Sequence, residues 1–202
     1  MSALTIASVW INAVLDGLVR EGLERAALTQ GLRGVVDGRA PDAGQIEVGL
    51  ARRIWRRARA LSDDPLLGLK VGSRLPMQAA NVVSVVRAHS GTFEESLRHM
   101  ARYQVLLSDS GRFMPTAREG GLRLTYEPSK AAVGIDPLQI DSVVGAAAGR
   151  RPRPVLVQLV GRAEVDPAPF ADLLGCPVRM GAAAATIDFD AAALATPIPG
   201  AD

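Results

Sequence analysis

The chain has 202 residues, and 48% of them are hydrophobic, which is enough to bury a well-packed core. A formal net charge of only +2 is too small for a domain whose whole surface binds nucleic acid. The single cysteine, Cys176, excludes an intrachain disulfide, and no apolar run reaches the roughly 18 residues of a membrane helix. These features predict one cytoplasmic domain without membrane contact.

The first half of the chain reads as a series of helices. Apolar residues recur at helical spacing in residues 8–23 and again in residues 45–61, where arginines fill many of the remaining positions. We interpret these arginines as a solvated face rather than a docking surface for DNA phosphate or an acidic partner. Shorter helices are expected at residues 24–30 and 65–72. Four glycines and a proline predict an irregular loop at residues 31–44.

The stretch from Ser90 to Phe113 joins the helical half to a strand-rich half. Thr92 and Glu95 form a T-x-x-E capping box, in which each side chain bonds the backbone N–H of the other residue. The helix that follows is expected to span residues 93–107. One side of it carries a mostly apolar stripe that consists of Phe93, Leu97, Met100, Ala101, Gln104 and Leu107. The residues SDSG then favour a turn.

The second half alternates between strands and helices. Residues 112–117 and 121–127 flank a Glu-Gly-Gly turn and predict a hairpin, in which Leu122, Leu124 and Tyr126 share one face. A nearly continuous apolar strand at residues 155–160 is expected in the interior of a sheet. The other expected elements are helices at residues 136–148 and 167–174 and strands at residues 178–180 and 186–189.

This order of elements predicts an α+β fold. A helical part, about residues 7–110, precedes a mostly antiparallel sheet with crossing helices, about residues 111–190. We expect residues 1–202 to form a single regulatory domain. On the last strand, the alternation of Asp188 and Asp190 is typical of a solvated face.

Four segments carry a family resemblance. They are residues 62–72 (SDDPLLGLKVG), 90–109 (SGTFEESLRHMARYQVLLSD), 170–180 (FADLLGCPVRM) and 197–202 (PIPGAD). In this order they resemble the N-terminal effector-sensing region of one branch of AraC-type bacterial transcription regulators, often called the arabinose-binding-like domain. The resemblance spans about residues 7–202. It implies a helix at the valine-rich residues 81–88, which by propensity alone would also suit a strand.

The resemblance implies a ligand-sensing or dimerisation domain that binds a small-molecule effector and forms a homodimer. Regulators of this kind bind DNA through a C-terminal pair of helix-turn-helix motifs, so we expect DNA binding only through that half, which is absent from this chain. The sequence does not identify the effector. Eight aromatic residues of the Phe, Trp and Tyr types are too few to favour a sugar site.

Three residues are candidates for contact with the effector. Gln104 places an amide inside the apolar stripe, where its polar atoms need hydrogen-bond partners. If the helix crosses one face of the sheet, Gln104 and Tyr126 converge on a mostly apolar pocket, and Arg112 can supply a charge at its mouth for an acidic effector. Two alternatives stay open: Gln104 bonds a neighbouring backbone, or Gln104 and Tyr126 satisfy each other in a closed core.

No motif points to catalysis or to a resident metal. The sequence has no Walker A motif and no G-x-G-x-x-G after a strand, and its two histidines, His89 and His99, lack partners at zinc-site spacing. We therefore predict neither an enzyme nor a bound cofactor. Two alternatives are a haem or gas sensor, with His89 or His99 as the iron ligand, and a stand-alone dimerisation adaptor with a closed core.

Overall fold

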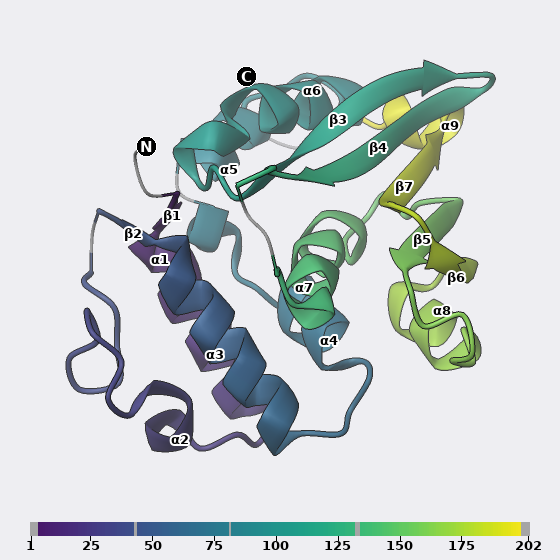
Figure 1. Ribbon diagram of the computed structural model, residues 1–202. Helices are drawn as coiled ribbons and strands as arrows, with labels where there is room; N and C mark the ends of the chain where they lie inside the picture. Colours follow the sequence, from purple (N-terminus) through teal and green to yellow (C-terminus); the bar gives the residue numbers. More distant parts are fainter. Residues whose placement is uncertain (1–3, 43, 81, 132–133, 199–202) are drawn as a thin grey trace.

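The computed structural model describes the chain except for residues 1–3, 43, 81, 132–133 and 199–202. A layer of helices from the first third of the chain lies beside a unit built on a five-stranded sheet (Figure 1). The predicted α+β class is confirmed. Among the described residues, no helix combines the length and the apolar character needed to cross a membrane.

The helical layer contains a short ribbon that local sequence patterns did not predict. Strand β1 (Thr5–Ala7) leads into helix α1 (Ser8–Arg20), and strand β2 (Gln45–Glu47) leads into helix α3 (Val48–Leu61). The two strands pair antiparallel, with Ile6 opposite Ile46. The helix expected from Gln45 therefore begins three residues later, because those residues pair with a segment about forty residues away.

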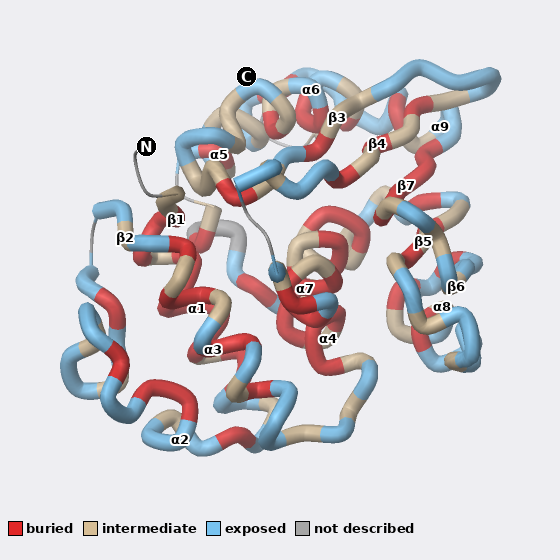
Figure 2. Tube along the Cα trace, in the orientation of Figure 1, coloured by how far each residue is buried: buried red, intermediate tan, exposed pale blue. Residues whose placement is uncertain are grey.

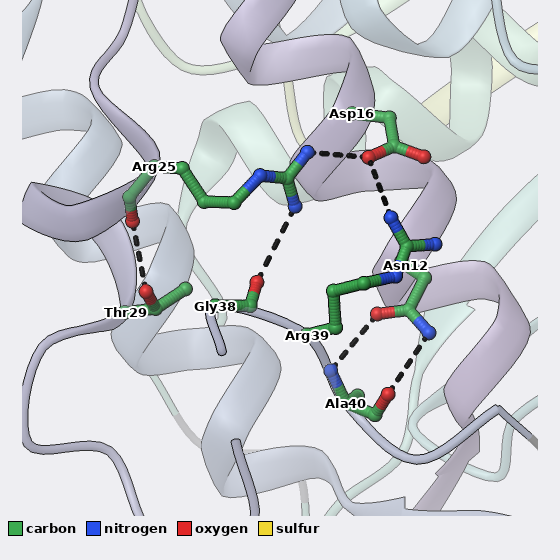
Figure 3. A network of polar contacts seen from close by, with 7 residues as sticks. All are labelled: Asn12, Asp16, Arg25, Thr29, Gly38, Arg39 and Ala40. Carbon is green, nitrogen blue, oxygen red and sulfur yellow. Dashed lines mark hydrogen bonds and ion pairs between the residues drawn. The ribbon is translucent and has the colours of Figure 1, made fainter. Parts of the chain in front are cut away.

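The glycine-rich segment between α2 (Arg25–Thr29) and β2 is irregular, as predicted, but it is tied to α1 by side chains (Figure 3). The buried Asn12 donates to the carbonyl of Ala40 at 3.1 Å and accepts from its N–H at 2.9 Å. Asp16, one turn further along α1, forms ion pairs with Arg25 at 2.5 Å and with Arg39 at 3.4 Å. These contacts hold the segment against the helix without regular structure of its own.

Four helical segments connect the helical layer to the sheet. They are α4 (Leu67–Ser73), the 3-10 turn η1 (Met77–Ala80), α5 (Val82–Ala88) and α6 (Phe93–Tyr103), followed by the 3-10 turn η2 (Gln104–Leu106). Thr92 caps α6 by accepting from the N–H of Glu95 at 3.3 Å. The reciprocal bond differs from the expected one, because Glu95 accepts from the N–H of Gly91 instead.

The sheet has the order β3-β4-β7-β5-β6. The predicted hairpin is confirmed by β3 (Gly111–Arg118) and β4 (Gly121–Pro128), which pair antiparallel. Helix α7 (Pro137–Ala148) precedes β5 (Leu156–Val160), which lies inside the sheet, antiparallel to β7 (Ala185–Asp190) and parallel to β6 (Val178–Ala182). Helix α8 (Ala168–Leu174) precedes β6, and α9 (Ala191–Leu194) follows β7.

The prediction that Asp188 lies on a solvated face is wrong. Asp188 is fully buried and accepts two hydrogen bonds from Arg123, at 2.7 and 2.8 Å, and a third from Arg118. Arg118 and Arg123 lie on the neighbouring hairpin, about 70 residues away in sequence, and neutralise the carboxylate where the strands meet. Asp190 is exposed and caps α9.

Two hydrophobic cores stabilise the molecule. The first gathers buried residues of α1, α3 and α4, and the second lies between the sheet and helices α6, α7 and α8. Figure 2 shows buried segments running through α1, α3, α4 and α7. The cores are joined where α4 and α7 pack together with glycines at the contact: a Cβ on Gly68 or Gly72 would overlap backbone atoms of α7.

Candidate ligand-binding cavity

A cavity of about 110 Å³ lies where the two cores meet. Helix α7 forms one wall through its residues Gln139, Val143, Ala146 and Ala147, which recur at helical spacing, and Arg150, just after the helix, extends this wall. The opposite face of α7, which carries Gly145, packs on α4. The remaining walls come from both cores: from β1, α1 and α3 of the first, and from α5, α6 and the hairpin of the second.

The walls are mostly apolar. Trp10 and Trp55 come from the helical layer, and Met100 and Phe113 come from α6 and β3. Trp55 is only 1% exposed, as expected for a core residue. An apolar interior with a few convergent polar groups is the usual composition of a small-molecule site.

Gln104 lines the cavity, and its amide also joins α6 to the sheet. Its side chain donates to the carbonyl of Phe113 at 2.9 Å and to that of Ala101 at 2.7 Å, and it accepts from the N–H of Phe113 at 2.6 Å. The amide therefore bonds the N–H and the carbonyl of Phe113, as a residue of a neighbouring strand would. The helix ends at Tyr103, four residues before the predicted end, and Gln104 turns toward the strand.

Tyr126 lines the same cavity and is 6% exposed. Burial raises the pKa of its phenol, and a hydrogen bond with Ser110 works in the opposite direction. Ser110 in turn shares a hydrogen bond of 2.8 Å with Ser108, which bonds the carbonyl of Thr5. Gln104 and Tyr126 thus meet at one cavity, as expected from their faces, but each has its own partners rather than the other.

Arg112 is not among the residues that line the cavity. Its side chain is 64% exposed and lies 3.8 Å from Glu127 on the neighbouring strand. Residues alternate between the two faces of a strand, so Arg112 lies on the face opposite Phe113, which is buried. The position of Arg112 therefore does not support the charge that we expected from it at the mouth of the pocket.

Two other arginines, Arg87 on α5 and Arg150 just after α7, line the cavity instead. Both are half-buried. Burial, and secondly the positive charge of Arg150, lower the pKa of the Arg87 guanidinium. No local pattern pointed to this pair, because Arg87 lies near the end of a valine-rich helix and Arg150 lies in an arginine-rich loop, 63 positions further along the chain.

Gln139 supplies a further polar group that sequence reasoning missed. It lies on the cavity face of α7 and is 5% exposed. Its Oε1 has no hydrogen-bond partner among the described residues, although nearly all buried polar atoms in proteins have one. A buried acceptor without a partner in a cavity wall is a position that a ligand donor would complete.

The histidines lie outside the cavity. His89 is exposed and its Nδ1 lies 2.8 Å from the carbonyl of Val85, whereas the Nδ1 of His99 lies 2.9 Å from the hydroxyl of Ser90. Neither lines the cavity, so the geometry gives no support to an iron site within it. Within the described part of the chain, no cluster of three or more potential metal-binding side chains occurs.

Comparison with known proteins identifies a family and a similar solved structure. The model of the arabinose-binding domain of AraC transcription regulators, an N-terminal domain, matches residues 22–198. The fold is similar to the crystal structure of transcriptional regulator CdpR from Pseudomonas aeruginosa, with a TM-score of 0.66 and 12% identity. The similarity covers 96% of this chain and 58% of that one, and at this identity it concerns the fold alone. No curated protein matches the sequence.

Proposed function

The chain belongs to the N-terminal arabinose-binding domains of AraC transcription regulators, and we propose that it senses a small-molecule effector in the cavity between its two cores. Domains of this family are ligand-sensing and regulatory. In the proposal, the effector is bound by this domain, and DNA is read by a part of the regulator outside this chain. The domain acts in the cytoplasm and catalyses no reaction on its effector.

The observation that carries the proposal is the composition of the cavity walls. Trp10 and Trp55 belong to the first core, whereas Phe113 and Tyr126 belong to the second. A ligand held here contacts both cores at once. Because a ligand favours the arrangement that it binds best, binding would shift the population of relative positions of the two cores. Such a shift is a signal that an attached DNA-binding part can receive.

A thermal-shift screen of small metabolites tests the proposal. A ligand that binds only the native protein raises the melting temperature, and the rise grows with ligand concentration. We expect a hit that stabilises the wild type but not Ala147→Phe, in which a ring fills the cavity. Ala60→Phe, an exposed substitution on α3, is the control and should respond like the wild type. A hit that stabilises Ala147→Phe as much as the wild type contradicts binding in the cavity.

A second function, dimerisation, is favoured by a separate observation. Four large apolar side chains lie exposed on the adjacent elements α5 and η2: Val82, Val85, Val105 and Leu106. Contiguous exposed apolar residues are typical of protein interfaces. We propose that this patch joins two copies of the domain. Sedimentation analysis should give a dimer for the wild type and a monomer for Val85→Glu, and a monomeric wild type would contradict the proposal.

A further inference from the structure

We propose that the effector is a small organic acid with a compact apolar body, and that its anionic group is bound between Arg87 and Arg150. This inference rests on the proposed function, because it names the class of ligand for the same cavity. It differs from what the family name suggests, since arabinose is a neutral sugar.

The charge of the cavity wall is the first argument. Arg87 and Arg150 line it, and the described part of the lining contains no aspartate and no glutamate. Across the described residues, the ion pairs include neither arginine. Two neighbouring cations without a counterion repel each other, and burial strengthens the repulsion. An anion placed between them would remove that cost.

The interior of the same protein offers a contrast. The buried Asp141 accepts from Arg162 at 2.8 and 3.0 Å, and the buried Asp188 is paired with Arg118 and Arg123. Elsewhere in the interior, opposite charges are thus matched with short contacts. The uncompensated pair at the cavity is consistent with a counterion that arrives with the ligand.

Both guanidinium groups are held in position by the protein. The Nε of Arg87 donates to the hydroxyl of Ser96 at 3.0 Å, and Arg150 donates to the carbonyl of Leu75. A guanidinium group has five N–H donors, so each arginine retains donors beyond its anchoring bond. Anchored arginines lose little freedom when they bind a carboxylate, and their planar geometry matches its two oxygens.

The rest of the cavity fits a small apolar body. A cavity of about 150 Å³ lined by aliphatic and aromatic side chains is known to accept benzene, so about 110 Å³ limits the apolar body to one ring at most, or to a short alkyl chain. Trp10, Phe113 and Met100 offer apolar contacts to it. The free Oε1 of Gln139 can accept a hydrogen bond from a hydroxyl or amine on that body.

Calorimetric titration with matched pairs of probes tests the inference. The probes are butyrate, hexanoate, benzoate and phenylacetate, each compared with its neutral amide at pH 7. We expect at least one acid to bind ten- to a hundredfold more tightly than its amide, which is the range for a hydrogen bond to a charged group. Arg87→Met and Arg150→Met should each reduce the affinity for that acid to the level of the amide. Arg87→Lys should retain part of it.

Arg112→Met is the matched control, because Arg112 is exposed and does not line the cavity, and it should leave the affinity unchanged. Urea unfolding of each variant separates a loss of binding from a loss of folding. The inference is overturned if no acid binds more tightly than its amide, or if both arginine variants bind the acid like the wild type. A third outcome separates the two proposals: the amides bind the wild type as tightly as the acids do, and they do not bind Ala147→Phe. This result would support binding in the cavity but would overturn the inference that the effector is an acid.

Discussion

Two opposite faces of helix α7 lie between the two cores, and they differ in how tightly they are packed. On one face, glycines let α7 and α4 approach until their backbones touch, and a Cβ on Gly145 would lie 2.7 Å from the carbonyl of Leu69. On the other face, Gln139, Val143 and Ala146 line a cavity. One joint is closed and fixed by backbone contact, whereas the other leaves room that a ligand can fill.

This difference indicates where a signal can arise. Backbone atoms in contact cannot move apart without losing packing, so the glycine contact acts as a fixed pivot. The cavity side is bounded by side chains from α1, α5 and the hairpin, which can adjust around a ligand. A ligand that enters the cavity therefore changes the spacing of the cores on one side of α7 and leaves the other side fixed.

The largest effect is expected at the closed joint. Gly72→Ala places a methyl group against the carbonyl of Ser142, and the clash involves backbone that cannot rotate away. We expect the free energy of unfolding to fall by roughly 4 kcal/mol, more than for most overpacked sites, because the clash is with backbone. Gly49→Ala is the control, because it lies in α3 with only the flexible Arg53 nearby and should stabilise by up to about 1 kcal/mol. Equal stability of Gly72→Ala and the wild type would show that α4 and α7 are not in backbone contact.

The next effect compares two residues of α6. Leu97 is fully buried in the second core, whereas Met100 lines the cavity. Leu97→Ala should cost roughly 3 kcal/mol, and Met100→Ala roughly 2 kcal/mol, because the neighbours of Met100 already adjoin open space. Urea unfolding measures both. A larger loss for Met100→Ala than for Leu97→Ala would mean that the cavity side is packed as tightly as the core.

A smaller effect is expected at Gln104, which joins α6 to β3. Gln104→Leu retains the volume but leaves the N–H and carbonyl of Phe113 without their partner. We expect a loss of roughly 1 to 2 kcal/mol and faster hydrogen exchange at Phe113. Unchanged exchange would indicate that the amide contributes nothing to the attachment of α6. In that case Gln104 would be free to contact a ligand.

The last effect is a pH dependence at the closed joint. Burial raises the pKa of Asp141 to about 6, against the lowering effect of Arg162. The folded protein therefore binds a proton more readily than the unfolded chain, in which the pKa is 3.8. The stabilisation from this proton is complete below pH 3.8 and is lost as the pH rises through about 6. Unfolding free energies of Asp141→Asn should lack this dependence, and identical pH profiles would contradict it.

Local sequence patterns predicted most helices and strands. They could not predict ion pairs between residues that are far apart in the sequence. The alternation of Leu122, Leu124 and Tyr126 placed Tyr126 on the core face, because a strand reverses its side chains at every residue. The burial of Asp188 depends on two arginines that only the folded sheet brings near. From the sequence, Asp188 could only be read as solvated.

The same limit applies to the cavity. Gln104 was identified because an amide interrupts an apolar stripe, which is a local signal. Arg87 and Arg150 interrupt no such stripe, and they converge only because the fold places α5 and the end of α7 at the same cavity. The charged part of the site was therefore assigned to Arg112, a residue on the outer face of the hairpin.

A crystal structure of the domain with the tightest-binding acid of the probe series would show directly where the effector binds. We expect the acid to lie between the two cores, with its carboxylate within hydrogen-bond distance of Arg87 and Arg150 and its apolar body against Trp10 and Phe113. An acid bound outside this cavity, or one whose carboxylate points away from both arginines, would contradict it.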